Sequence, residues 1–165
     1  MIASRITAWA VAACFFCLSA TASHASTPCS EAADPEDAGI AILRCGTVVV
    51  AAEATAVHSS ASSMSSHQGV IQLDAGAIAV SADSLMAQFS ALTPDAVVSG
   101  GDGEWIIVAE SGRTRAAVWR GTIVERRRSD GSQKVLRAGD GEPSEVDSSR
   151  SERLALALRR AKSHP

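Results

Sequence analysis

The sequence predicts an all-β module, in the form of a sandwich, barrel or solenoid, followed by a short C-terminal α-helix. Short runs of alternating apolar residues recur between turn-forming segments, and most are too short for helices. In addition, a large aliphatic residue is followed three positions later by glycine at Gly46, Gly76, Gly121 and Gly139. Glycine adopts positive φ without steric cost, so each of these glycines is expected to form a tight corner between two strands.

Residues 1–25 have the three parts of a secretory signal peptide. Arg5 supplies the positive charge, residues 6–18 form an apolar run, and small residues offer cleavage after Ala22 or after Ala25. The apolar run is shorter than the roughly 20 residues with which a helix crosses a bilayer. We therefore predict a cleaved signal, a periplasmic protein and no transmembrane span after cleavage. The alternative is an uncleaved signal that anchors the chain in the inner membrane.

The charge balance of the chain limits its partners. The chain has 165 residues and a formal net charge of −3. Nucleic-acid binding needs clustered Lys and Arg, so this balance argues against a nucleic-acid partner. The one basic run, Arg126 to Arg128, is interpreted as a solvated hairpin end beside the turn-forming residues 129–132. The alternative is contact with an anionic partner such as a lipid headgroup.

The cysteines predict a disulfide. Cys14 and Cys17 leave with the signal, whereas Cys29 and Cys45 enter an oxidising compartment. A bridge between Cys29 and Cys45 would close a loop and stabilise the fold by roughly 3 kcal/mol. The alternative is a pair of unpaired thiols.

Turn-forming segments divide the exported chain. Residues 26–38 are polar and contain two prolines, so we predict an irregular leader ahead of a β domain at 39–143. The serine-rich residues 58–67 bury almost nothing and are predicted to be a mobile loop. Residues 74–76, 100–103, 110–113 and 129–132 are predicted turns. The predicted strands are 40–43, 47–51, 55–57, 70–73, 77–80, 89–93, 96–98, 104–109, 114–120, 122–127 and 134–137.

One helix is predicted within the tail at 144–165. Ser149 to Glu152 fits a capping box, and Leu154, Leu158 and Ala161 then share one face. Isolated helices this short are marginal in water. We therefore expect the helix to dock on its own β domain; the alternative is docking on a partner.

An ordered set of short motifs runs from about residue 40 to residue 142. It comprises Gly46-Thr47 and Thr55, then Leu73, Gly76, Ile78 and Val80, then Thr93, Pro94 and Ala96, then Trp105, Gly112, Thr114, Val118 and Gly121, and finally Leu136 and Gly139. This order resembles the FecR-like periplasmic domain family. The resemblance implies a twisted β-solenoid-like stack of short strands. It covers the family's β module only, without the sigma-regulator and receptor-contacting parts.

No motif in the sequence supplies a reaction. The glycines at 100–103 precede a strand and not a helix, so they lack the helix N-terminus that would bind a phosphate. His58 and His67 flank the serine-rich stretch without further ligands, which makes a poor metal site. We therefore predict no catalytic, cofactor-binding or metal-binding residues. The alternative is a hydrolase on a β scaffold, whose carboxylates would come from Asp74, Asp95, Asp102 and Glu110.

The tryptophans differ in their surroundings. Trp105 lies in an apolar strand and is expected in the core, whereas Trp119 stands near Arg115 and beside Arg120. Trp119, if exposed, would make with these two arginines a contact surface for a protein or a glycan; the alternative is burial. Together these features predict an exported, non-enzymatic protein-interaction module in envelope signalling or regulation. A module that binds peptidoglycan or another envelope glycan is the alternative.

Overall fold

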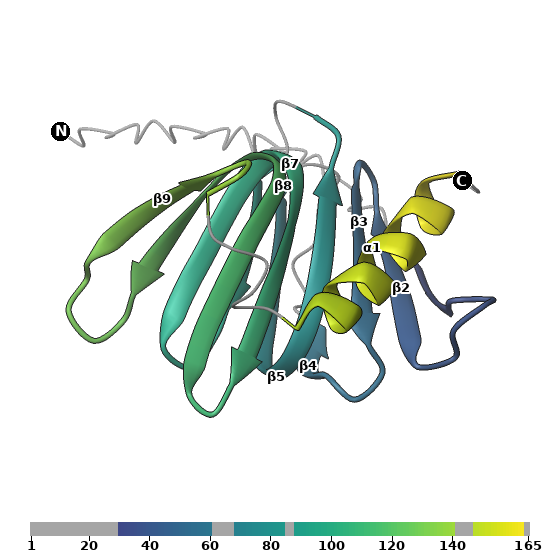
Figure 1. The fold of residues 1–165 in the computed structure, drawn as a ribbon, viewed down its shortest axis with the longest axis horizontal. Coiled ribbons are helices and arrows are strands. Elements are labelled where there is room, and N and C mark those ends of the chain that lie inside the picture. The colour runs from purple at the N-terminus through teal and green to yellow at the C-terminus, as the bar shows by residue number, and fades with distance from the viewer. Residues whose placement is uncertain (1–29, 61–67, 85–87, 141–146, 164–165) are drawn as a thin grey trace, which may run out of the picture.

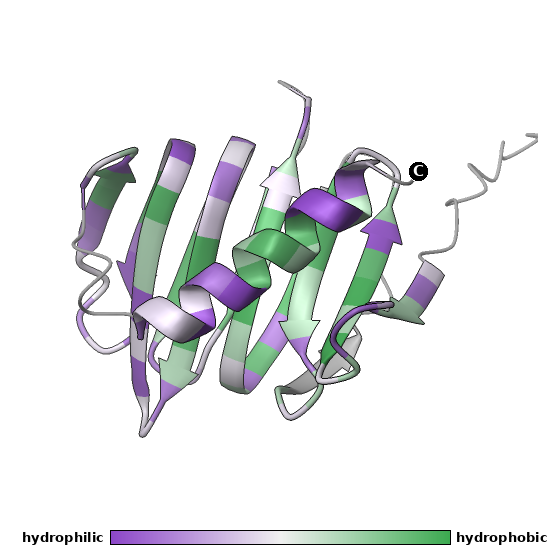
Figure 2. Ribbon diagram, turned by 45° about the vertical axis from the view of Figure 1, so that its right-hand side comes forward, coloured by the Kyte–Doolittle hydropathy of each residue, from purple (hydrophilic) through white to green (hydrophobic). Residues whose placement is uncertain are grey.

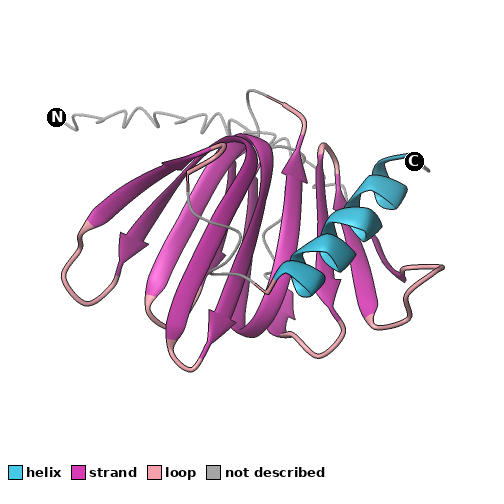
Figure 3. Cartoon of the chain, viewed as in Figure 1, coloured by secondary structure: helices cyan, strands magenta, loops and turns pink. Residues whose placement is uncertain are grey.

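A computed structural model describes residues 30–60, 68–84, 88–140 and 147–163 of the chain. Within these ranges, nine strands form one open sheet and one helix lies against it (Figure 1, Figure 3). The all-β class with a C-terminal helix is thus confirmed. The elements are β1 (Ser30–Ala33), β2 (Ile40–Cys45), β3 (Val48–Glu53), β4 (Val57–Ser60), β5 (Gln68–Ala82), β6 (Gln88–Leu92), β7 (Ala96–Glu110), β8 (Arg113–Arg127), β9 (Gln133–Arg137) and α1 (Ser148–Ser163).

Three long strands fold the sheet over on itself. The first half of β5 pairs with β4 and β6, whereas its second half pairs with β3 and β7. Likewise, the first half of β7 pairs with β6 and with the second half of β8, and its second half pairs with β5 and with the first half of β8. The result is two layers. The helix-side layer contains β1, β2, β3 and one half of each long strand, and the far layer contains β4, β6, β9 and the other halves.

The bends in the long strands occur at glycines. Gly76 has a φ of 99° and Gly121 a φ of 87°, in the region that glycine alone adopts easily. At Gly121 the neighbouring strand β7 also leaves no room for a side chain, because a Cβ atom there would lie 2.4 Å from the carbonyl oxygen of Asp102. The prediction that the chain reverses at residues 74–76 and 100–103 is therefore wrong, because β5 and β7 continue through these residues. The backbone bends there, and the strand continues into the other layer.

The pairing gives the protein two apolar cores. Along β7, Trp105 and Ile107 point between the two layers, whereas Ile106 and Val108 point toward α1. Trp105 is fully buried, as predicted. The inter-layer core also contains Leu73, Phe89, Val98, Ile123 and Leu136, and the helix-side core contains Ile40, Ile42, Ala51, Ala77, Ala79 and Ala117.

Helix α1 docks on its own sheet, as expected. Leu154, Ala157, Leu158 and Ala161 are buried on the strands β2, β3 and β5. Figure 2 shows hydrophobic residues along the strands that α1 crosses, with hydrophilic residues at several hairpin ends. The predicted capping box is wrong by two residues. Asp147 caps the helix, because its carboxylate accepts the backbone N–H of Ser149 at 3.0 Å.

Ion pairs hold both ends of α1 in place. Basic side chains of the helix meet acidic side chains that border the helix-side layer, which complements the apolar contact beneath. The pairs, with their shortest N–O distances, are Arg150–Glu53 at 2.5 Å, Arg153–Asp37 at 2.8 Å, Arg160–Asp34 at 2.9 Å and Lys162–Glu104 at 2.7 Å.

Two segments predicted to be irregular contain strands. Residues 30–33 of the expected leader form β1, which pairs with β2 through its backbone while all its side chains stay exposed. Residues 58–60, at the start of the serine-rich stretch, belong to β4, which begins at Val57 and pairs with β5. A strand that is held by backbone hydrogen bonds does not need alternating apolar side chains, so the hydrophobic pattern of the sequence does not indicate it. The rest of the serine-rich stretch, 61–67, lies outside the described residues.

Candidate functional site

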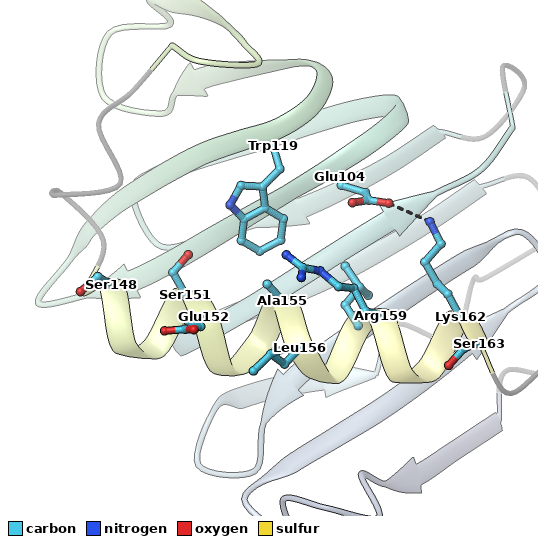
Figure 4. Close-up of a pocket in the computed structure, with 11 residues that line it drawn as sticks. Glu104, Trp119, Ser148, Ser151, Glu152, Ala155, Leu156, Arg159, Lys162 and Ser163 are labelled. Carbon is cyan, nitrogen blue, oxygen red and sulfur yellow. Dashed lines mark hydrogen bonds and ion pairs between the residues drawn. The ribbon is translucent and has the colours of Figure 1, made fainter.

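A hollow of about 720 Å³ lies between α1 and the strands β7 and β8. The helix covers the β2, β3 and β5 part of its layer and leaves the β8 side open, so one flank of α1 forms a wall. Figure 4 shows the indole of Trp119 and the guanidinium of Arg159 directed into this space. Its lining includes Glu104, Trp119, Ser151, Ala155, Arg159 and Lys162. We call this space the Trp119 hollow.

Trp119 lies at an irregularity in the β-ladder and lines the hollow. Trp105 pairs with Val118 and Glu104 pairs with Arg120, so Trp119 is an extra residue between two paired positions. Trp119 follows the alternation of β8, in which Ala117 faces the helix-side core and Val118 faces the inter-layer core. Trp119 is half-buried: it packs against the helix-side core and also lines the hollow.

One end of the Trp119 hollow is ionic. The Lys162 ammonium lies 2.7 Å from Glu104 and 3.1 Å from Asp83. Burial opposes the charged form of Lys162, but the hydrogen bonds to these two carboxylates prevail and raise its pKa. Lys162 therefore stays charged at neutral pH and fixes the end of α1 to the sheet.

The structure separates the three residues predicted as a partner surface. Arg120 is exposed, yet its guanidinium lies 2.6 Å from Asp83 and 3.1 Å from Asp102, so it belongs to the ionic end. Burial opposes the charge on Arg120, but the hydrogen bond to Asp102 and the surrounding carboxylates raise its pKa. Arg115 lines a different hollow. Of the three, Trp119 alone lines the space beside α1, and its role as a contact residue stays a prediction.

A second hollow, of about 300 Å³, lies on the other side of β8. It opens between β8 and β9 where the two layers part. Its lining includes Thr114, Arg115, Ala116, Glu125, Arg127 and Lys134. We call this space the basic hollow, because three of these six side chains carry a positive charge and one a negative charge.

The first half of β8 forms an edge of the helix-side layer between the two hollows. Residues 113–120 pair with β7 on one side, whereas β9 joins β8 only from Thr122 to Arg126. Over the described ranges, no strand pairs with the outer side of residues 113–120. Unpaired strand edges are docking sites for another chain.

The histidines that were considered as metal ligands cannot be placed in this structure. His67 lies outside the described residues, as does the side chain of His58. Within the described part of the chain, no group of three or more His, Cys, Asp or Glu is placed to hold a metal ion. None of the helices in that part is both long and apolar enough to cross a membrane.

The disulfide remains a prediction, because Cys29 lies outside the described residues. The register of β1 on β2 pairs Ser30 with Arg44. Peptide mapping of the non-reduced protein would test the bridge.

Sequence reasoning missed most of the Trp119 hollow. Glu104 and Lys162 are far apart in the sequence and meet only because α1 returns to the sheet. The helical pattern identified the buried face of α1, but the flank of Ser151, Ala155 and Arg159 carries no comparable signal. The arginines near Trp119 were the one sequence feature that indicated this site, and they correctly indicated strand β8.

Comparisons with known proteins find only solved structures of low sequence identity. Neither a family model nor a curated protein matches the chain. Two solved structures of a putative anti-sigma factor from Parabacteroides distasonis are similar. The first has a TM-score of 0.44 and 13% identity over 70% of this chain and 53% of that chain. The second has a TM-score of 0.38 and 12% identity over the same shares. This chain thus spans about half the length of the structures that it matches.

Proposed function

We propose that this chain is an exported, non-enzymatic FecR-like domain that acts as a protein-interaction module in envelope signalling or regulation. After removal of residues 1–25 it works in the periplasm, where it holds a segment of a partner protein. The resemblance of the motifs between residues 40 and 142 to that family supports the proposed setting.

The Trp119 hollow is the observation that carries this proposal. Binding energy in protein interfaces concentrates at a few large anchors, often tryptophan or arginine, that sit in a rigid frame with a polar rim. Trp119 has such a frame, since the indole packs on the helix-side core and α1 walls the hollow. The ion pair between Lys162 and Glu104 holds that wall at a fixed position.

Affinity purification of the processed protein from envelope extracts tests the proposal. A partner protein should co-purify with the wild type, and Trp119→Ala should lower its recovery at least tenfold. Val135→Ala is the matched control, because Val135 is 51% exposed on β9 and lies outside the hollow. Equal recovery with wild type and Trp119→Ala would contradict the proposal.

A glycan is the second candidate ligand. Carbohydrate rings stack on exposed aromatic faces, and the Trp119 hollow places Glu104, Ser151 and Glu152 around a half-exposed indole. Sedimentation with purified peptidoglycan separates the two candidates. A glycan-binding module should sediment with the cell wall and lose this property in Trp119→Ala, whereas a protein-interaction module should stay in the supernatant.

A further inference from the structure

The edge of β8 directs backbone groups away from the sheet at Ala116 and Val118. The backbone N–H of Thr114 points outward, because it donates to the Asp95 carboxylate at 3.1 Å and not to β7. In an antiparallel pair the outward positions recur at every second residue. The pairing of β7 with β8 is regular from Arg113 to Val118, so Ala116 and Val118 share the orientation of Thr114. Over the described residues, neither has a backbone partner on that side.

The two hollows flank this edge on opposite faces of the layer. The Trp119 hollow lies on the helix side, and the basic hollow lies on the side that faces β9. A strand added beside Ala116 and Val118 would send its side chains alternately to the two faces. Every second side chain would then enter the basic hollow, and the ones between them would lie toward Trp119.

The charge of the basic hollow indicates what such a strand carries. Arg127 and Lys134 belong to the inward-facing rows of β8 and β9, and the Arg127 side chain is 60% exposed. Glu125, whose side chain is 10% exposed, lies 3.9 Å from Arg127 and offsets one of the two charges. Acidic side chains would therefore complement this face. On the other face, the half-buried Trp119 offers apolar contact.

We propose that the partner of this module contributes an extended segment that joins the sheet as a new strand beside Ala116 and Val118. Its acidic side chains point toward Arg127 and Lys134, and its apolar side chains point toward Trp119. This inference rests on the proposed protein-interaction function and names the partner's chemistry: an alternating acidic and apolar strand.

Amide exchange with synthetic peptides tests the inference directly. The probe is a capped peptide of about ten residues that alternates valine and glutamate, and its matched control alternates valine and lysine. In the full processed protein, the glutamate peptide should slow exchange at the amides of Ala116 and Val118 at least tenfold, since both gain hydrogen-bond acceptors. The lysine peptide should leave both amides unchanged. Unchanged exchange with the glutamate peptide overturns the inference.

Two sets of variants separate backbone pairing from charge. Ala116→Pro removes one outward N–H without removing a bond to β7, and proline is tolerated on edge strands. It should abolish the protection at Val118. The double variant Arg127→Glu and Lys134→Glu should reverse the preference to the lysine peptide. Arg126→Glu is its matched control, because Arg126 follows Glu125 on the same strand but lies on the opposite face of the layer.

The outcomes separate this inference from the proposed function. If Ala116→Pro does not fold, the double variant Arg127→Glu and Lys134→Glu still tests strand addition, because both substitutions lie at exposed positions. If the co-purified partner needs Trp119 but tolerates Ala116→Pro and the charge reversal, strand addition is wrong and the interaction function stands. If no partner depends on Trp119, the proposed function itself is wrong.

Discussion

The hydroxyl groups of Thr93 and Thr114 lie 2.5 Å apart in the interior, although 21 positions separate them in the chain. Both hydroxyls also donate to the carboxylate of Asp95, and the Thr93 hydroxyl holds the backbone N–H of Ala96 at 3.0 Å. Thr93 stands in the turn between β6 and β7, and Thr114 is the second residue of β8. Two separate motifs of the sequence, Thr-Pro-x-Ala and Gly-x-Thr, thus meet in one cluster that fastens the far layer to the helix-side layer.

The first prediction concerns this cluster. Thr114→Val keeps the shape of the side chain but removes the hydroxyl that meets both the Thr93 hydroxyl and the Asp95 carboxylate. We expect the free energy of unfolding to fall by about 1.5–3 kcal/mol, the usual net contribution of a hydrogen bond to a charged group. Urea denaturation followed by circular dichroism measures it. A loss within experimental error would show that the cluster does not fasten the two layers.

The second prediction concerns acid stability. Partial burial opposes the charge on Asp95, but hydrogen bonds from Thr114 and Thr93 prevail and hold its pKa below the ordinary value of 3.8. A carboxyl group whose pKa is lowered by folding stabilises the protein above its ordinary pKa. That contribution disappears as the pH falls below 3.8 toward the pKa in the folded state.

Asp95→Asn should therefore be less stable than the wild type at neutral pH and should lose less stability on acidification. Urea titrations at several pH values between about 6 and 3 compare the two proteins. Thr114→Val should also flatten the pH dependence, because it removes the strongest of the hydrogen bonds that lower the pKa. Parallel curves for wild type and Asp95→Asn would contradict the assignment.

The corner glycines show how far the sequence predicts the fold. Gly46, Gly76, Gly121 and Gly139 all have positive φ, as expected from the spacing of apolar residues and glycine. Their different roles could not be predicted, because a hairpin and a bend inside a strand require the same backbone freedom. The partner strands decide between the two, and they are distant in sequence. Gly46 lies in a hairpin, whereas Gly76 and Gly121 lie within β5 and β8.

The third prediction separates backbone strain from close approach. Gly121 and Gly139 have nearly the same φ, 87° and 85°. A Cβ atom at Gly139 would meet nothing within 4 Å, whereas one at Gly121 would meet the backbone of Asp102 and Gly103. Gly139→Ala should cost about 1–2 kcal/mol through strain alone, and Gly121→Ala should cost about 3 kcal/mol or more. Equal losses in thermal denaturation would contradict a tight contact at the bend.

The fourth prediction concerns the attachment of α1. Arg150 donates to Glu53 through two nitrogens, at 2.5 Å and 2.7 Å, and also contacts Glu110. The hydrogen bonds to Glu53 raise the pKa of Arg150 against the opposing effect of burial. Arg150→Met should leave the largely buried Glu53 without its cation and cost about 1–3 kcal/mol.

Arg153→Met is the matched control on the same helix. Its guanidinium binds Asp37 at 2.8 Å, but the side chain is 54% exposed, so water screens the pair. We expect little change in urea denaturation. If both variants lose the same stability, the ion pair of Arg150 has no special role in docking α1.

The Trp119 hollow could be predicted only in part. Trp119 stood out because charged residues flank it beside a corner glycine. The wall opposite Trp119 comes from α1. The position of α1 depends on contacts between residues distant in the sequence, such as Arg150 and Glu53, which are 97 positions apart. The open edge of β8 was equally hidden, because the sequence does not show that β9 pairs only with the second half of β8. Local patterns therefore identify the strand and the helix but not the space between them.

Site-specific photocrosslinking in living cells tests the central claim most directly. A photoreactive phenylalanine analogue at position 119 should form one protein adduct that fractionates with the periplasm. The same analogue at position 135, on the exposed side of β9, should not form that adduct. Failure to form any protein adduct from position 119, or an identical adduct from both positions, would contradict the claim that the Trp119 hollow holds a partner polypeptide.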